Sequence, residues 1–191
     1  MYRLARTISA ILSPLLFIPL LLLFKLEETV STSTQFATAI SIIFGLGVLP
    51  GILGLTFLKL THRVSDWDIP IRKERPAFNF WVLFCNVLLI VGLNWGSFYQ
   101  LTRLAEIILV WFALFTLITF YWKISAHSAG VTLFSLIVFR SMPGFLLWGG
   151  LLIVSVGWAR IYLGKHTLAQ IVGGAILSSL IYIFATGLKL V

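Results

Sequence analysis

The chain consists mostly of long apolar runs that are separated by short polar segments. Only 10% of its residues are charged and its mean hydropathy is +1.05, whereas soluble domains carry about 25% charged residues. A helix needs about 20 predominantly apolar residues to cross a membrane, and several of these runs reach that length. The sequence therefore predicts an all-α, membrane-embedded protein.

The apolar runs also set the number of predicted helices. The first, Ile8 to Phe24, has no small-residue cleavage site and is followed by Lys25 and Glu27, so we interpret it as a membrane helix and not as a signal peptide. The later runs cover residues 36–58, 78–93, 101–122, 130–139, 145–156 and 167–188. Because the run at 130–139 is short, we expect a polytopic transmembrane helical bundle of about six to seven helices. We expect it to form a single integral-membrane domain over residues 1–191.

The formal net charge of +8 has two explanations, and both remain open. Cytoplasmic loops of membrane proteins are enriched in Lys and Arg, and a phosphate site also needs fixed positive charge. The cations are dispersed among the membrane runs instead of forming one soluble basic face, which argues against nucleic acid as a partner. The expected partners are the lipid bilayer and a lipid phosphate substrate within it.

Three polar segments stand out, at residues 61–76, 125–128 and 160–170. Two predicted spans separate each segment from the next, so alternation places all three at the same membrane face. Ionisable groups at membrane depth are costly and are functional candidates by default. We therefore expect the three segments to contribute to one site.

His166 is the candidate nucleophile of this site. A neutral imidazole nitrogen can attack phosphorus and form a covalent intermediate, provided that an acceptor holds the other ring nitrogen and fixes the tautomer. Gln170 lies four residues later, and this spacing predicts that it shares a helix face with His166 and accepts that hydrogen bond. The alternative for a histidine at this position is a role in capping or packing a helix start.

His127 is the candidate general acid, because a leaving alkoxide needs a proton and an imidazole can supply one near neutral pH. Ser125 and Ser128 flank His127 just before an apolar helix, whose positive N-terminal end suits a phosphate group. Ser125 is equally a candidate N-cap, and the two roles are compatible.

Four cations are candidates for binding the phosphate, since guanidinium groups match phosphate oxygens in a bidentate manner. Arg72 and Arg75 are neighbours if their segment is helical, and Arg160 precedes His166 by six residues. Lys73 is a further candidate, although it could instead pair with Glu74 or face lipid headgroups.

Asp66 and Asp68 flank Trp67 in the first polar segment. Two carboxylates could bind magnesium at a diphosphate, but we favour a role in ordering the loop and pairing with nearby arginines. We therefore predict no metal and no other cofactor.

The order and spacing of these segments resemble the type-2 phosphatidic acid phosphatase superfamily. Its three motifs are Lys-x6-Arg-Pro, Pro-Ser-Gly-His and Ser-Arg-x5-His-x3-Asp. The corresponding segments here are Asp68-x6-Arg75-Pro76, Ile124-Ser125-Ala126-His127 and Ala159-Arg160-x5-His166-x3-Gln170. The resemblance implies a metal-independent helical bundle with His166 as nucleophile, His127 as general acid, and Arg75 and Arg160 as phosphate ligands.

Two positions depart from the pattern of the superfamily. Asp68 stands where the motif has lysine, so Arg72 or Lys73 is the expected source of the missing charge. Gln170 stands where the motif has Asp, and the arrangement His166-Thr167-x2-Gln170 is similar to that of dolichyl diphosphatase-like members. This second resemblance favours isoprenoid phosphates or diphosphates as the expected substrates.

The expected function is hydrolysis of a lipid phosphomonoester or diphosphate, either phosphatidic acid-like or isoprenoid, through a phosphohistidine. The alternatives are a lipid phosphotransferase and a catalytically weak or silent lipid-phosphate-binding scaffold. Both histidines and both key arginines are present, which argues against a silent protein. The oligomeric state stays open.

The distribution of cations predicts which way the site faces. The motif side also carries Arg3, Arg6, Lys59, Arg63 and Lys123, whereas the opposite side carries mainly Lys25, Arg103 and Arg140. By the positive-inside rule, the site faces the cytoplasm of a multi-pass membrane protein.

Overall fold

The computed structural model describes residues 1–190, and these residues form helices and connecting segments without any strand. The expected all-α class is confirmed. The chain divides into two compact units: unit 1 comprises residues 1–21 and 123 onward, and unit 2 comprises residues 22–122. The expectation of one integral-membrane domain stays a prediction.

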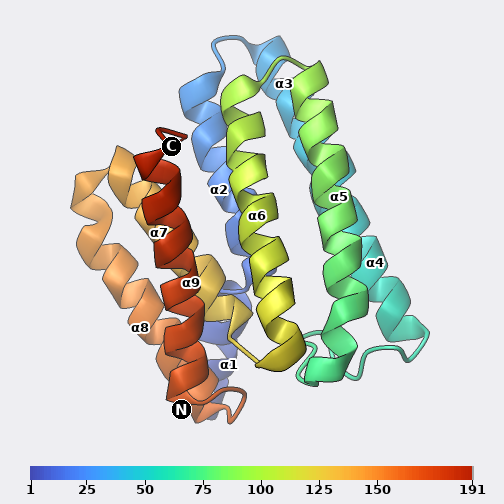
Figure 1. The fold of residues 1–191 in the computed structure, drawn as a ribbon, viewed down its shortest axis with the longest axis vertical. Helices are drawn as coiled ribbons and strands as arrows, with labels where there is room; N and C mark the ends of the chain where they lie inside the picture. The colour runs from blue at the N-terminus through green and yellow to red at the C-terminus, as the bar shows by residue number, and fades with distance from the viewer. Residues whose placement is uncertain (191) are drawn as a thin grey trace. The chain divides into compact units, whose positions relative to one another are not determined.

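Each unit is a helical bundle (Figure 1). Unit 1 contains α1 (Tyr2–Ile11), the first part of α2 (Pro14–Thr29), α7 (Ala126–Ser141), the 3-10 turn η3 (Pro143–Phe145), α8 (Leu146–Tyr162) and α9 (Leu168–Gly187). Unit 2 contains the rest of α2, α3 (Ser33–Ile42), the π-helical segment η1 (Ile43–Val48), α4 (Leu49–Leu60), the 3-10 turn η2 (Arg72–Glu74), α5 (Arg75–Trp95) and α6 (Tyr99–Tyr121).

Five helical segments of the described chain are long and apolar enough to cross a membrane. They are Ser33–Leu60, Arg72–Trp95, Tyr99–Tyr121, Pro143–Tyr162 and Leu168–Gly187. The bent pair α1 and α2 raises the number to six if it counts as one span. Helix α7 corresponds to the run at 130–139 and has only 16 residues, which is shorter than a typical span.

The first apolar run is not one helix, contrary to the prediction for Ile8 to Phe24. Helix α1 ends at Ile11, α2 begins at Pro14, and the two axes are bent by 42°. The cause is Pro14, because proline lacks an N–H group and disfavours helical backbone at the residue before it. As a result, α1 is a separate short helix whose buried residues are Ala5 and Ser9.

Most of the polar segment between the first two predicted runs, residues 25–35, is helical in the structure. Helix α2 continues to Thr29, and α3 begins at Ser33 with Thr32 as its N-cap, whose side chain accepts a hydrogen bond from the Gln35 N–H. Side-chain capping stabilises a helix start in this way.

In unit 1, α7 packs against both α8 and α9. The first turns of α7 and α9 lie together, since the backbone N–H of Ser125 donates to the carbonyl of Gln170 over 3.0 Å. Further along, the Ser178 hydroxyl of α9 donates to the Ala129 carbonyl of α7 over 2.6 Å. These contacts make α7 and α9 parallel neighbours, and the polar segments that precede them lie at the same end of unit 1.

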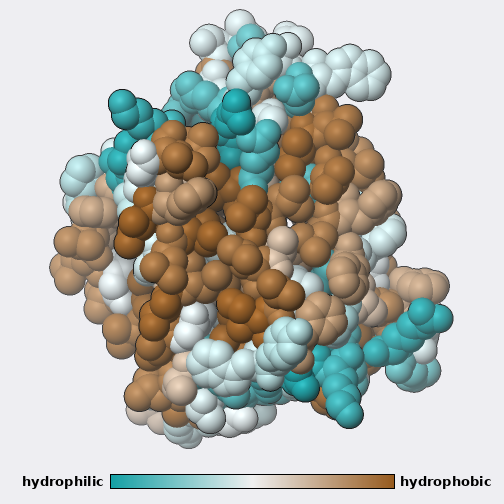
Figure 2. Space-filling model, viewed as in Figure 1, coloured by the Kyte–Doolittle hydropathy of each residue, from teal (hydrophilic) through white to brown (hydrophobic). Residues whose placement is uncertain are grey.

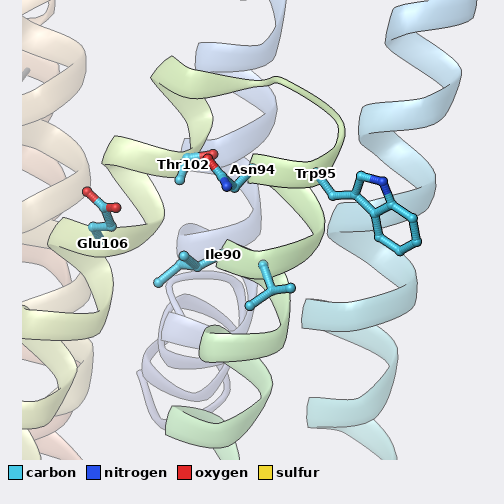
Figure 3. Close-up of a pocket in the computed structure, with 6 residues that line it drawn as sticks. Ile90, Asn94, Trp95, Thr102 and Glu106 are labelled. Atoms are coloured by element: carbon cyan, nitrogen blue, oxygen red, sulfur yellow. The ribbon is translucent and has the colours of Figure 1, made fainter.

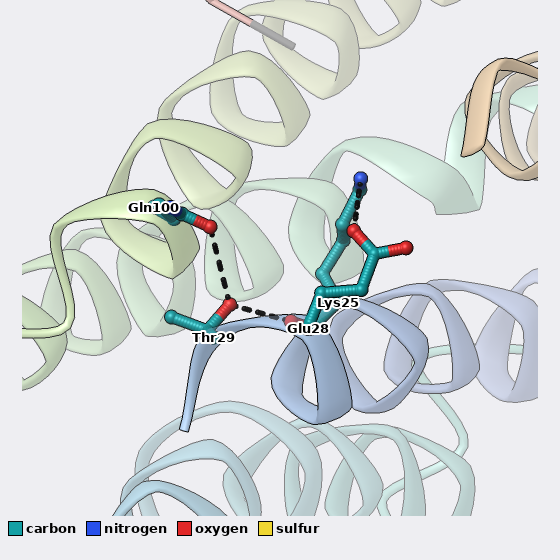
Figure 4. Close-up of polar contacts among 4 residues, drawn as sticks. All are labelled: Lys25, Glu28, Thr29 and Gln100. Carbon is teal, nitrogen blue, oxygen red and sulfur yellow. Dashed lines mark hydrogen bonds and ion pairs between the residues drawn. The ribbon is translucent and has the colours of Figure 1, made fainter. Parts of the chain in front are cut away.

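In unit 2, α5 and α6 form an antiparallel hairpin (Figure 1). At the hairpin turn, the hydroxyl of Thr29 at the end of α2 lies 3.5 Å from Oε1 of Gln100 at the start of α6. The same hydroxyl donates to the Lys25 carbonyl, and Lys25 forms an ion pair of 2.7 Å with Glu28 (Figure 4). This polar group fastens the end of α2 to the α5–α6 turn.

Large apolar side chains are exposed along the helices. In α9, for example, Ile176, Leu180 and Ile183 are 53%, 60% and 63% exposed and follow one side of the helix. Figure 2 shows apolar side chains over most of the face in view, with hydrophilic side chains gathered in smaller groups. Contiguous exposed apolar surface of this extent is typical of proteins embedded in lipid. The protein is a multi-pass membrane protein.

Candidate functional site

The position of Arg160 relative to His166 is set by the end of helix α8. Gly164 adopts a left-handed backbone with φ of +64°. The N–H of Lys165 donates to the Arg160 carbonyl over 3.0 Å, and the N–H of Gly164 donates to the Ile161 carbonyl over 2.9 Å. These two bonds form a Schellman motif, which favours glycine at its left-handed position. The turn folds His166 back toward the end of α8, where its own N–H lies 3.3 Å from the Arg160 carbonyl.

His166 and Gln170 contact each other as the spacing predicted, but for a different reason. His166 precedes the N-cap of α9, which is Thr167, so it does not share a helix face with Gln170. Instead, Thr167 and Gln170 form a capping box, in which the Gln170 N–H donates to Thr167 Oγ1 and Gln170 Oε1 accepts from the Thr167 N–H over 3.2 Å. The same Oε1 atom lies 3.0 Å from Nδ1 of His166.

The capping box also fixes the tautomer of His166. A backbone N–H group can only donate, so the Gln170 atom that faces the Thr167 N–H must be the amide oxygen. That oxygen is an acceptor, and it therefore requires a hydrogen on Nδ1 of His166. In a neutral imidazole, Nε2 is then the basic nitrogen. This is the tautomer that a nucleophilic histidine needs.

His127 and Arg160 are joined through Ser9, a residue that the sequence did not single out. His127 is the second residue of α7, and its Nε2 atom lies 3.1 Å from the Ser9 carbonyl oxygen. Nη1 of Arg160 donates to the Ser9 hydroxyl over 2.8 Å. The three residues are 7%, 2% and 7% exposed, in the order His127, Arg160 and Ser9. Ser9 thus connects the candidate general acid to the candidate phosphate ligand.

Ser125 is the N-cap of α7 and is fully buried. Its hydroxyl accepts from the Ser128 N–H over 3.3 Å, and the Ser128 hydroxyl donates to the Ile171 carbonyl of α9 over 2.8 Å. The capping role expected for Ser125 is confirmed, while its contact with phosphate stays a prediction. Both serines fix the start of α7 against α9, which holds His127 at the same end of unit 1 as His166.

The close approach of α7 and α9 depends on Gly174. A Cβ atom at this position would lie 2.6 Å from the Ser125 carbonyl oxygen and 3.2 Å from the Ala129 nitrogen. We expect Gly174→Ala to lower the free energy of unfolding by about 1–3 kcal/mol, because two backbones would have to separate. Thermal unfolding in detergent measures this loss.

The matched control for Gly174→Ala is Gly150→Ala in α8, where a Cβ atom would meet nothing within 4 Å. This variant should unfold at or slightly above the wild-type temperature, since alanine favours helix. Equal unfolding temperatures for the two variants would show that the α7–α9 contact tolerates a methyl group.

The charges of unit 1 are all of one sign. Every Asp and Glu of the sequence lies in unit 2, at Glu27, Glu28, Asp66, Asp68, Glu74 and Glu106. The Lys and Arg residues of unit 1 are Arg3, Arg6, Lys123, Arg140, Arg160, Lys165 and Lys189. The N-terminal ends of α7 and α9, which lie together, add further positive potential. These charges favour an anionic ligand over a cationic one.

Lys123 and Lys165 add cations next to the histidines, and the sequence did not identify them as site residues. The Lys123 ammonium donates to the Lys165 carbonyl over 3.0 Å. Lys165 directly precedes His166, and Lys123 lies just before α7. Their position beside both loops became apparent only from the packing of α7 against α9.

The remaining predicted phosphate ligands, Arg72, Lys73 and Arg75, lie in unit 2. Arg75 is buried, and its Nε donates to the Ile69 carbonyl over 3.1 Å. Nη1 of Arg72 donates to the carbonyls of Thr119 and Phe120, where it caps the C-terminal end of α6. Lys73 is exposed. The binding of phosphate by these three residues stays a prediction.

The loop before η2 is ordered by Glu74. Its Oε2 atom accepts hydrogen bonds from both the N–H and the hydroxyl of Ser65, over 2.9 and 2.8 Å. No ion pair joins Lys73 to Glu74 within residues 1–190. Asp66 accepts from the backbone N–H of Trp67 over 2.8 Å. In the described part of the chain, no three His, Cys, Asp or Glu side chains are gathered as metal ligands.

One pocket of unit 2 contains none of the predicted site residues. It is lined by Ile90, Val91, Asn94, Trp95, Thr102 and Glu106. Figure 3 shows Asn94 and Thr102 side by side, with the Trp95 ring turned away from them. Glu106 pairs with Arg103 over 2.9 Å at an exposed position. The pocket therefore has a mixed polar and apolar lining without buried fixed charge.

No family model matches this chain, and neither a curated protein nor a solved structure matches it.

Proposed function

We propose that the protein is a membrane phosphatase that hydrolyses a lipid phosphate through a phosphohistidine on His166. The observation that carries the proposal is the pairing of His166 Nδ1 with Gln170 Oε1 at 3.0 Å. Because the capping box fixes Oε1 as an acceptor, Nδ1 carries the hydrogen and Nε2 is the basic nitrogen that attacks phosphorus. The motif spacing that resembles the type-2 phosphatidic acid phosphatase superfamily supports the same activity.

In the first step, Nε2 of His166 attacks phosphorus, and the bond from phosphorus to the leaving oxygen breaks. The Gln170 oxygen stabilises the positive charge that develops on the His166 ring. Arg160, at the end of α8, binds the non-bridging phosphate oxygens and neutralises their negative charge. Fixed positive charge at these oxygens stabilises the transition state and so raises the rate.

His127 supplies the proton of the first step. The Ser9 carbonyl can only accept, so Nε2 of His127 carries a hydrogen. An imidazolium carries a hydrogen on each ring nitrogen. As an imidazolium, His127 keeps the Nε2 hydrogen on the Ser9 carbonyl and gives its Nδ1 hydrogen to the leaving oxygen, which departs as an alcohol or as a lower phosphate. The neutral His127 then takes a proton from the water that attacks the phosphohistidine, so inorganic phosphate is released and both histidines return to their starting states.

The substrate class follows from the surroundings of the site. The helices of unit 1 carry exposed apolar side chains such as Ile176 and Leu180, which suit an acyl or isoprenyl chain in the bilayer. The cations of the unit suit the phosphate headgroup. The cytoplasmic orientation rests on the distribution of Lys and Arg and stays a prediction.

Phosphate release by the purified protein in detergent with EDTA tests the proposal. The panel contains phosphatidic acid, phosphatidylglycerol phosphate, and isoprenyl mono- and diphosphates. We expect release from at least one of these in the presence of EDTA, since the chain supplies the nucleophile and the cations itself. Transfer of phosphate to an added alcohol would identify a phosphotransferase. No turnover of any lipid by a monodisperse protein would favour the scaffold alternative.

A further inference from the structure

Ser9 contacts both Arg160 and His127. It lies in α1 and is 7% exposed. Its side-chain oxygen accepts from Arg160 and its backbone carbonyl accepts from His127. The two contacts come from different groups of the residue, so they can be separated by mutation.

The hydroxyl hydrogen of Ser9 has no acceptor within residues 1–190. A guanidinium group only donates, so the contact with Arg160 uses the oxygen of Ser9 and not its hydrogen. Hydroxyls in other helices here donate to the carbonyl four residues earlier, as Thr29, Ser41 and Thr56 do. The hydroxyl of Ser9 makes no such bond, although it is buried.

A buried hydroxyl with an unused hydrogen is costly, and a bound acceptor would offset that cost. The acceptor must lie near Arg160 and His127, in a unit with no Asp or Glu. A phosphate oxygen meets these conditions, because it can accept from the Arg160 guanidinium and from the Ser9 hydroxyl together. Accepting from Arg160 also polarises the Ser9 hydroxyl and strengthens its donation.

We propose that Ser9 is a phosphate-binding residue whose hydroxyl donates to a non-bridging phosphate oxygen that is also bound by Arg160. The assignment rests on the proposed function, in that it places the substrate phosphate at Arg160. Helix α1 thereby contributes directly to substrate binding. The bend at Pro14 separates α1 from α2, and α1 places Ser9 beside Arg160 and His127.

The test compares Ser9→Ala with Thr7→Ala, which removes an exposed hydroxyl from the same helix. Ser9→Ala leaves the backbone carbonyl, and therefore the contact with His127, in place. We expect it to weaken the binding of inorganic phosphate, measured by calorimetry, by about tenfold or more and to lower kcat/KM by a similar factor. Thr7→Ala should change neither value, and Ser9→Thr, which keeps a hydroxyl, should restore most of both.

A double-mutant cycle with Arg160→Lys links the two residues. If both bind the same phosphate, Ser9→Ala should cost less in the Arg160→Lys background than in the wild type. Additive losses would contradict a shared ligand.

The outcomes distinguish a failure of the Ser9 assignment from a failure of the proposed phosphatase activity. An active wild type, with Ser9→Ala equal to Thr7→Ala in phosphate affinity and kcat/KM, overturns the Ser9 assignment and leaves the phosphatase intact. A lower unfolding temperature alone would show a purely structural role and has the same consequence. An inactive wild type that binds phosphate in a Ser9-dependent manner overturns the hydrolysis and supports Ser9. A wild type that does not bind phosphate overturns the assignment.

Discussion

His166→Ala should reduce phosphate release to the background rate, a loss of at least about 10⁴-fold in kcat. The reason is that alanine removes the Nε2 atom that attacks phosphorus, while His127, the other histidine of unit 1, serves as the general acid. The loss should appear in kcat and not in KM, because the bond from His166 to phosphorus forms only as the reaction proceeds. Initial rates over a range of lipid concentrations separate the two parameters.

The control for this variant is His62→Asn. His62 is an exposed histidine of unit 2 with a backbone φ of 57°, a conformation that asparagine tolerates. It should keep full activity, and both variants should unfold at temperatures close to that of the wild type. If His166→Ala retains a tenth or more of the wild-type rate, His166 is not the nucleophile.

Gln170→Leu should lower kcat by about 100-fold or more, since the wrong tautomer of a catalytic histidine can cost up to about 10⁴-fold. Leucine fills a similar volume but offers no oxygen to Nδ1 of His166. Gln170→Glu should keep at least the wild-type rate, because its carboxylate accepts from both His166 and the Thr167 N–H and adds a negative charge beside the developing imidazolium. Steady-state kinetics on the same lipid measures both effects.

Gln170 also belongs to the capping box, so its effect on stability must be separated from its effect on catalysis. Thr167→Ala removes the other half of the box and leaves the Gln170 oxygen beside His166. We expect this variant to lose about 0.5–2 kcal/mol of stability while kcat changes little. If Thr167→Ala lowers kcat as much as Gln170→Leu does, the contribution of Gln170 is structural and does not act through the tautomer of His166.

The sequence predicted the helical class well, because a membrane helix needs about 20 predominantly apolar residues and such runs are easy to recognise. It did not predict the helix boundaries where a single residue, such as a proline, breaks an otherwise apolar run. The run from Ile8 to Phe24 is apolar in most positions, and this composition predicted one helix where Pro14 imposes a break. Likewise, α2 extends beyond the first apolar run and α3 begins before the second. The Thr29 hydroxyl bonds to the Lys25 carbonyl at the end of α2, and Thr32 caps the start of α3, which the polarity of these residues alone does not predict.

For the site, the sequence predicted pairs that are close along the chain and missed those that are distant. The contact of His166 with Gln170 was predicted from spacing, although the Schellman turn and the capping box produce it. Ser9 could not be found in this way, because nothing near it in sequence marks it as functional. The sequence shows that residues 1–21 and 123 onward contain no Asp or Glu. It does not show that these two segments pack together, so the excess of positive charge in unit 1 could be recognised only from the structure.

The packing of Ser9 has a consequence for how the protein is made. Ser9 is 118 residues from His127 and 151 residues from Arg160 along the chain. At about 5–20 residues per second, the ribosome needs on the order of ten seconds to synthesise that interval. During this time α1 lacks the helices α7 and α8, so Ser9 makes neither its contact with His127 nor its contact with Arg160. In a chain that stops before α8, Ser9 lacks Arg160, and polar groups without partners are costly in a membrane. We therefore expect such a truncated chain to be degraded faster than the full-length chain.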